Sequence, residues 1–239
     1  MRLHKWLLLG VCAAGLTASV AAVADGLVVD KIYHPYVDAL ETEIELRSVF
    51  QDEQPNLTNK AQVHQFAIGK ALSDKVFAEV YMIGGKDRAR GFENEAWEAE
   101  IKWQLSDQGE YSADWGVVVE YEDENTRDIQ EFAVGIIAEK EFSRWSGTAN
   151  FFMIREWGDD IRSEYETTLG LQARYRYSPL LEPTVEFYAG QDTRAIGPVL
   201  QGTMPLGIRK NLHWEAGVIF GLDSVSANKT WRMLLEYEF

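Results

Sequence analysis

Most of the side chains that could do chemistry in this sequence are carboxylates, and they recur at every second position. Glu43 and Glu45 form one such row, and Glu98 and Glu100 form another. The chain holds 38 Asp and Glu residues against 23 Lys and Arg, a net charge of −15 at pH 7. Rows of carboxylates favour cations. A chain this acidic has no electrostatic reason to bind nucleic acid.

Metal ligands other than carboxylates are sparse. Cys12 is the only cysteine, and the histidines are scattered along the chain at positions 4, 34, 64 and 213. No recognisable metal motif results from this spacing. We therefore expect no metal and no cofactor.

One pair of side chains has the types needed for nucleophilic catalysis. If the first hairpin is centred near Asn56, Ser48 and His64 lie opposite each other, and the histidine could activate the serine hydroxyl. Met82 would face His64 from the next strand, so this reading offers no carboxylate or amide to orient the ring. Ser48 and His64 are the only catalytic candidates.

The elements that must position these groups are strands. In segment 164–177 the odd-numbered residues are mostly apolar or aromatic and the even-numbered ones mostly polar, which is the two-residue period of a strand. Pro198 and Pro205 weaken one candidate strand, because proline cannot donate to a ladder. The count would be ten if 183–190 and 197–209 do not both span a membrane. Twelve candidate strands lie at 39–50, 62–72, 75–83, 94–105, 111–122, 129–142, 147–157, 164–178, 183–190, 197–209, 211–222 and 230–239.

The connections between these strands alternate in character. Those after odd-numbered strands are polar or charged loops, and those after even-numbered strands are mostly shorter turns. This asymmetry is typical of barrels that cross an outer membrane, and the strands reach the roughly 9–11 residues that such a crossing needs. The sequence therefore predicts an all-β, up-and-down antiparallel transmembrane β-barrel of about 12 strands. A soluble β-sandwich would alternate too, but it would not explain the loop asymmetry.

Residues 1–24 are typical of a secretory signal peptide. A positive start precedes an apolar run over 6–20, and Ala22-Val23-Ala24 forms a small-residue cleavage pattern before Asp25. The run is short for a membrane anchor, so we expect export and cleavage near Ala24. The predicted organisation is a signal peptide over 1–24, a periplasmic or plug segment over 25–38 and a transmembrane barrel over 39–239.

Segment 25–38 is too apolar for a solvated tail. Val29, Ile32, Tyr33 and Val37 are among its apolar residues. It could fold into the lumen as a small plug or dock a periplasmic partner, and the sequence leaves both possibilities open.

The last strand ends on Leu235, Tyr237 and Phe239, with one residue between each. This ending resembles the C-terminal signal that Gram-negative outer-membrane barrels present to the assembly machinery, although Leu234 stands where that signal often has a glycine. The resemblance implies the bacterial outer membrane as location, with membrane lipid and the barrel-assembly machinery as partners. Twelve-stranded barrels of this kind include narrow solute channels and a phospholipase. Lipid-cleaving barrels place a Ser–His pair facing lipid near the outer rim.

With the apolar faces toward lipid, the other faces line the interior with 17 acids and 5 bases. A watery, cation-preferring pore would use these carboxylates directly. In a narrow barrel, acids and arginines could instead cross-link and fill the space. The candidate pore-lining residues are Glu43, Glu45, Glu98, Glu100, Lys102, Asp114, Glu139, Glu166, Arg174, Arg176, Glu186, Glu215 and Arg232.

The sequence thus favours a porin-like narrow channel or transport component for cationic or neutral small solutes. Channels of this size that carry acidic sugars line their pores with tracks of basic residues, and this sequence has no such tracks. Two alternatives remain. One is a non-conducting structural or partner-binding barrel, and the other is a lipid-modifying outer-membrane hydrolase.

Overall fold

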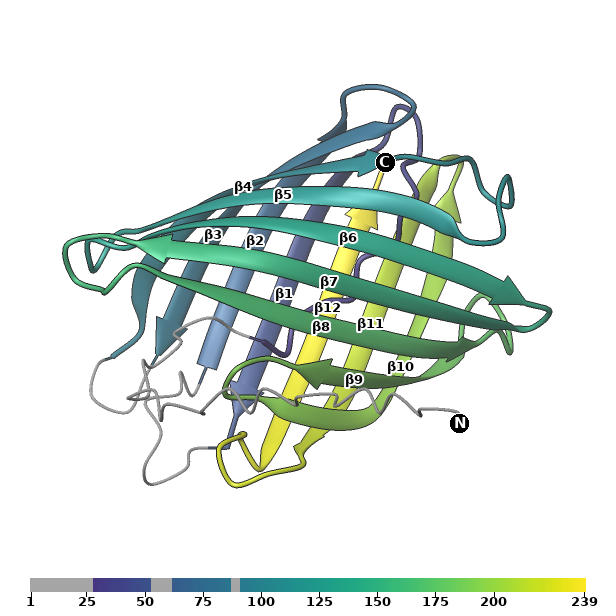
Figure 1. The fold of residues 1–239 in the computed structure, drawn as a ribbon. Coiled ribbons are helices and arrows are strands. Elements are labelled where there is room, and N and C mark those ends of the chain that lie inside the picture. Colours follow the sequence, from purple (N-terminus) through teal and green to yellow (C-terminus); the bar gives the residue numbers. More distant parts are fainter. Residues whose placement is uncertain (1–27, 53–61, 87–90) are drawn as a thin grey trace, which may run out of the picture.

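The computed structural model describes residues 28–52, 62–86 and 91–239, so the predicted signal peptide lies outside the described residues. Twelve antiparallel strands close into a barrel in which each strand pairs with its sequence neighbours and β1 pairs with β12 (Figure 1). The predicted fold class is confirmed. Among the described residues, no helix is long and apolar enough to span a membrane. The strands are β1 Thr42–Gln51, β2 Gln62–Ala71, β3 Val76–Lys86, β4 Glu93–Gln104, β5 Asp114–Glu124, β6 Gln130–Phe142, β7 Trp145–Trp157, β8 Glu164–Tyr175, β9 Glu182–Ala189, β10 Arg194–Gly207, β11 Lys210–Gly221 and β12 Lys229–Glu238.

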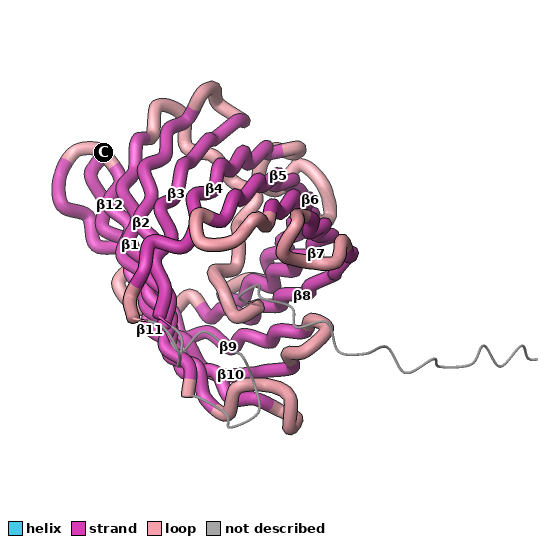
Figure 2. The backbone as a smooth tube through the Cα atoms, turned by 90° about the vertical axis from the view of Figure 1, so that its left-hand side faces the viewer, coloured by secondary structure: helices cyan, strands magenta, loops and turns pink. Residues whose placement is uncertain are grey.

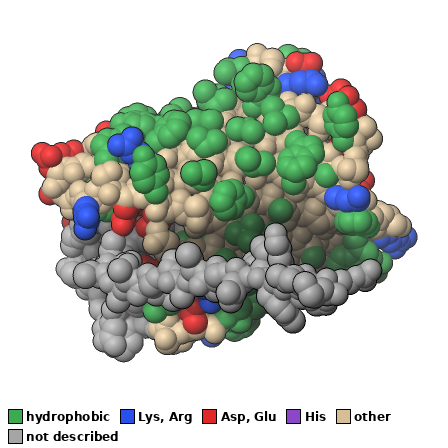
Figure 3. All heavy atoms as spheres, in the orientation of Figure 1, with side chains coloured by type: hydrophobic (Ala, Val, Ile, Leu, Met, Phe, Trp, Pro, Cys, Tyr) green, Lys and Arg blue, Asp and Glu red, His purple; other side chains and the backbone are tan. Residues whose placement is uncertain are grey.

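The two faces of the barrel wall have opposite polarity. Along β1, Glu43 and Glu45 are buried inside, whereas Ile44 and Leu46 are exposed outside. Hydrophobic side chains cover much of the outer face seen in Figure 3. Successive residues of a strand point to opposite faces. The two-residue alternation in the sequence therefore gives the barrel an apolar exterior and a charged interior.

Closure of the barrel rests on the last strand. Leu235 lies opposite Leu46 of β1, and Tyr237 lies opposite Ile44. The backbone N–H of Phe239 donates to the carbonyl of Thr42 at 2.8 Å. The pairing leaves no open sheet edge, which in lipid would cost several kcal/mol for each unsatisfied backbone group.

The strand with two prolines is a full member of the sheet. β10 pairs with both β9 and β11, and its ladder to β11 shifts register between Pro205 and Gly207. The alternative count of ten strands is therefore wrong. The prolines are accommodated along the strand and at the irregularity near its end.

The barrel has two distinguishable ends. At the loop end lie the ends of β1 and β3, the starts of β2 and β4, and the connections 125–129, 158–163, 190–193 and 222–228. At the turn end lie the mostly shorter connections, together with the start of β1 and the end of β12.

Candidate functional site

Residues 28–41, here called the lumen segment, run through the interior of the barrel and end at the rim, where Leu40 is 74% exposed. In Figures 1 and 2 the chain before β1 runs inside the ring of strands. Val29 and Ile32 pack against a cluster that contains Tyr188 of β9. Tyr33 packs in a second cluster with Phe152 of β7. The segment thus contacts well-separated parts of the wall, beginning near the loop end and finishing at the turn end.

Asp30 joins the lumen segment to two arginines of the wall. Its carboxylate lies 2.8 Å from Nη1 of Arg47 on β1. Its backbone carbonyl accepts from Nη1 of Arg232 at 2.7 Å and from the Tyr188 hydroxyl at 2.6 Å. One residue is therefore held by β1, β9 and β12 together.

Lys31 brings a positive charge into the middle of the interior. Its Nζ lies 3.0 Å from Glu45 and 3.4 Å from Glu79, and it donates to the Tyr81 hydroxyl at 2.6 Å. Glu45 is fully buried, and 4% of Glu79 is exposed. Buried carboxylates need such a partner because desolvation disfavours their charge.

Tyr33 is fixed by both its backbone and its side chain. Its N–H donates to Asn150 Oδ1 at 2.7 Å, and its carbonyl accepts from Asn150 Nδ2 at 2.9 Å. Its hydroxyl lies 2.7 Å from Glu100 and 2.9 Å from Glu120. Since Asn150 is on β7 while the two acids are on β4 and β5, Tyr33 bridges three strands.

Beyond Tyr33, the segment runs on toward the turn end. His34 Nδ1 lies 2.5 Å from Glu139 of β6, which also contacts Arg174 at 3.1 Å. The Tyr36 hydroxyl donates to Asp114 at 2.8 Å. Polar contacts therefore follow the segment along most of its length.

A second buried ion cluster lies in the wall itself. Arg232 is fully buried, and its Nη2 lies 2.9 Å from Glu186 and 2.8 Å from Glu215. Glu215 also contacts His213 Nε2 at 3.1 Å. We call the region around Lys31, Arg47 and Arg232, with their carboxylate partners, the deep lumen.

On the loop side of the lumen segment lies a cavity of about 180 Å³. We call it the acidic cavity. Among the described residues that line it, nine are acidic, and Lys31 is the only Lys, Arg or His. The acidic lining residues are Asp30, Glu98, Glu120, Glu122, Glu124, Glu131, Glu156, Glu166 and Asp192.

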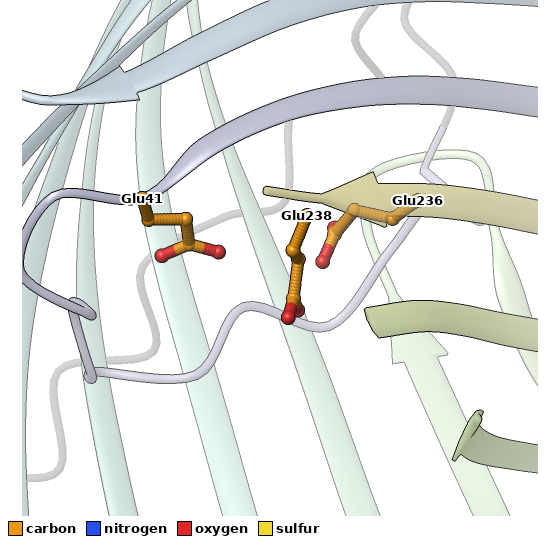
Figure 4. Close-up of side chains that lie close together, drawn as sticks. All are labelled: Glu41, Glu236 and Glu238. Atoms are coloured by element: carbon orange, nitrogen blue, oxygen red, sulfur yellow. The ribbon is translucent and has the colours of Figure 1, made fainter. Parts of the chain in front are cut away.

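Three carboxylates meet at the turn end. Figure 4 shows Glu41, Glu236 and Glu238 turned toward one another, with candidate ligand oxygens within 4.8 Å. Burial, and then the neighbouring Glu238 carboxylate, raise the pKa of Glu41 above its ordinary value. Similar groups occur inside the barrel at Glu43–Glu45–Glu79 and at Glu98–Glu100–Glu120.

The structure places most of the predicted pore-lining residues inside the barrel. Lys102 lies over the Phe77 ring at 5.5 Å. Arg176 follows the last residue of β8 and pairs with Glu141 near the turn end, so it lies at the rim. The fully or largely buried members are Glu43, Glu45, Glu100, Asp114, Glu139, Glu166, Glu186, Glu215 and Arg232.

Several interior residues were missed by the sequence reading. Asp30, Lys31 and Tyr33 lie in the segment for which a plug was one of two possibilities, but their contacts with the wall were not predicted, because the segment has no periodicity to show which side chains meet the wall. Tyr81 and Tyr188 carried a usable signal, because each stands two residues from an interior glutamate, Glu79 and Glu186 respectively, and residues two apart share a strand face.

Ser48 and His64 are brought together as predicted cross-strand partners. Ser48 Oγ lies 2.7 Å from His64 Nδ1. The amide nitrogen of Gln62 contacts His64 Nε2 from the same strand. Gln62 is a side-chain partner that the sequence reading missed, because the orienting group was expected on the neighbouring strand. On that strand Gly84 lies opposite His64, so the expected position of Met82 is wrong: Met82 lies opposite Phe66.

Comparison with known proteins identifies the fold. A scan against protein-family models gives no match, and a search of curated proteins gives no relative. The KdgM porin in complex with disordered oligogalacturonate matches with a TM-score of 0.54 and 8% identity, over 82% of this chain and 98% of that one. An outer membrane channel from Pseudomonas putida F1 matches with a TM-score of 0.55 and 14% identity, over 88% and 97% of the two chains. The NanC porin matches with a TM-score of 0.51 and 7% identity, over 82% of this chain and 98% of that one.

Proposed function

We propose that this chain is a narrow channel of the bacterial outer membrane, that its lumen segment limits conduction, and that its acidic cavity favours cationic or neutral small solutes. The apolar exterior supports a position in lipid. The shared fold with porins and outer-membrane channels supports the same location. Membrane lipid, the barrel-assembly machinery and small solutes are the partners that this proposal implies.

The acidic cavity is the observation that carries the solute preference. Nine acidic residues and one lysine line a cavity of about 180 Å³, and two of the nine, Asp30 and Glu124, also pair with arginines outside the lining. Charged side chains that line a pore select ions of the opposite sign. Low-dielectric walls also focus the field of those charges. An anion that enters from the loop end would meet a negative potential before it reaches Lys31.

The contacts of the lumen segment support its role as a constriction. Asp30 and Tyr33 together bond to β1, β4, β5, β7, β9 and β12. A solute that crosses the barrel must pass beside this segment or displace it. Conduction in the docked state is therefore small, and release of the segment enlarges it.

A planar-bilayer recording tests the proposal. A refolded chain that begins at Asp25 is inserted, and single-channel currents are recorded under a KCl gradient. We expect small discrete steps and a reversal potential that favours potassium. A folded barrel that stays silent, or one that favours chloride, would contradict the channel or its selectivity respectively.

A further inference from the structure

A chain of three polar side chains lies on the outer face of the barrel, away from the lumen. Ser48 and His64 are half-buried, and both have the strand parity of the exposed residues Phe50 and Phe66. Ser48 Oγ and His64 Nδ1 are 2.7 Å apart. The Gln62 amide contacts the opposite ring nitrogen, Nε2. The order hydroxyl, imidazole, amide is that of a nucleophile, its base and the group that orients the base.

The surroundings hold the imidazole in place. The His64 ring packs edge-on against Phe50 at 5.4 Å and in a tilted arrangement against Phe92 at 5.7 Å. With aromatic contacts to two rings and hydrogen bonds at both nitrogens, the ring cannot turn without losing several contacts. A catalytic base needs this kind of fixed orientation.

The tautomer that catalysis needs is available through Gln62. The amide can present either its nitrogen or its oxygen to His64 Nε2 after a half-turn about its last bond. With the oxygen toward the ring, Nε2 carries the proton and Nδ1 has a free lone pair. Nδ1 then accepts the Ser48 proton, as a general base requires.

The position of these residues selects the substrate class. Ser48 is near the end of β1 and Gln62 begins β2, so the site lies toward the loop end of the apolar exterior. Phe66, Met82 and Phe92 nearby are 43%, 59% and 60% exposed. Aromatic side chains gather where a bilayer changes from hydrocarbon to headgroups. The acyl esters of lipids lie at that boundary.

We propose that Ser48, His64 and Gln62 form the nucleophilic site of a lipid acyl-ester hydrolase on the outer face of the barrel. Ser48 Oγ attacks the ester carbonyl carbon while its proton moves to His64 Nδ1. The bond from that carbon to the alcohol oxygen breaks, and the alcohol leaves with the proton from His64. Water then attacks the acyl-serine, gives a proton to His64 and releases the fatty acid, and His64 returns the proton to Ser48.

Covalent labelling tests the site without altering it. The refolded chain from Asp25, in detergent micelles, is treated with hexadecylsulfonyl fluoride and digested, and the peptides are identified by mass spectrometry. We expect an adduct on Ser48. Thr167 is the matched internal control, because it is an exposed hydroxyl on β8 whose partner on β7 is Met153 rather than a histidine. An unlabelled Ser48, or labelling equal to that of Thr167, would overturn the proposal.

Hydrolysis itself is measured in mixed micelles of phosphatidylethanolamine, by the appearance of free fatty acid. We expect Ser48→Ala and His64→Ala to lower the rate by about 10²–10⁴-fold, and Thr167→Ala to leave it unchanged. Gln62→Ala should lower kcat more than it raises KM. Gln62→Glu should restore kcat, because a carboxylate also accepts from Nε2–H. A rate equal in Ser48→Ala and the parent chain would overturn the proposal, and so would no release from a barrel whose heat-modifiable gel band shows that it is folded.

Discussion

The deep lumen and the acidic cavity are built from the same residue types but have different charge balances. In the deep lumen, Lys31, Arg47 and Arg232 are each within ion-pair distance of carboxylates. In the acidic cavity, Lys31 is the only base among the described lining residues, and of the nine acids Asp30 pairs with Arg47 and Glu124 with Arg127. The cations therefore concentrate where the lumen segment docks.

This difference separates two roles for carboxylates in one barrel. Where carboxylates are fully buried, they bind cationic side chains and hold the segment across the lumen, because an unpaired buried charge is costly. Toward the loop end the interior opens into a cavity, where water and mobile cations can neutralise the acids. An excess of negative charge inside the barrel thus marks the part of the lumen that remains open to solutes.

Replacing Lys31 should have the largest effect on the difference between the deep lumen and the acidic cavity. Lys31→Met leaves Glu45 and Glu79 without this ammonium group, and loss of one partner from a buried pair costs about 3–5 kcal/mol. We expect the lumen segment to undock, single-channel conductance to rise and the barrel to unfold at lower temperature. Lys140→Met is the control, since Lys140 is exposed beside the Phe142 ring on the outside. Equal conductance in the two variants would show that Lys31 does not hold the constriction.

Neutralising the acidic cavity should change selectivity rather than stability. Glu124→Gln with Asp192→Asn removes two charges from its lining. We expect the reversal potential under a KCl gradient to move toward zero, most clearly at low ionic strength, where screening is weak. Asp107→Asn with Glu110→Gln, on an exposed turn, removes the same charge elsewhere. An equally large shift of the reversal potential in this control would show that surface charge, rather than the acidic cavity, sets the ion selectivity.

The smallest effect is expected where the two regions meet. Tyr33→Phe removes the hydroxyl that lies between Glu100 and Glu120. Leaving buried acceptors without this donor should lower the free energy of unfolding by about 1–3 kcal/mol, measured by urea titration in micelles. Tyr165→Phe serves as the comparison because 69% of Tyr165 is exposed. If the two variants unfold alike, the Tyr33 contact adds nothing to stability.

The fold could be predicted from the sequence because lipid outside and charge inside impose a strict two-residue period. The predicted strand at 164–178 corresponds to β8 at Glu164–Tyr175, and the one at 129–142 to β6 at Gln130–Phe142. In β7 the period was hidden by four apolar residues in succession. Phe152 points inward because Gly135 on β6 leaves room for its ring: a Cβ there would lie 2.4 Å from it.

The site was less accessible to sequence reasoning. Residues of the barrel wall alternate between the inner and outer face, so Glu186 and Arg232 could be placed inside from the sequence. Their pairing with each other depends on how the barrel curves, which the sequence does not show. The lumen segment has no period, and only the three-dimensional path puts Asp30 between Arg47 and Arg232. Gln62 is different, because it stands two residues before His64 and shares its strand face. That signal was present in the sequence.

The claim that the lumen segment limits conduction is tested most directly by tethering it. Val28 Cγ2 lies 2.9 Å from a Cβ built at Gly190, close to the separation of about 3 Å between a sulfur and the opposite Cβ in a disulfide. Val28→Cys with Gly190→Cys can therefore be joined, and a chain from Asp25 holds no other cysteine.

Single-channel conductance is then recorded with both cysteines in the Lys31→Met background, before and after a reductant is added to the same bilayer. We predict small steps while the disulfide holds the segment across the lumen and larger steps once it is reduced. Conductance that is the same in the oxidised and reduced states would contradict the account.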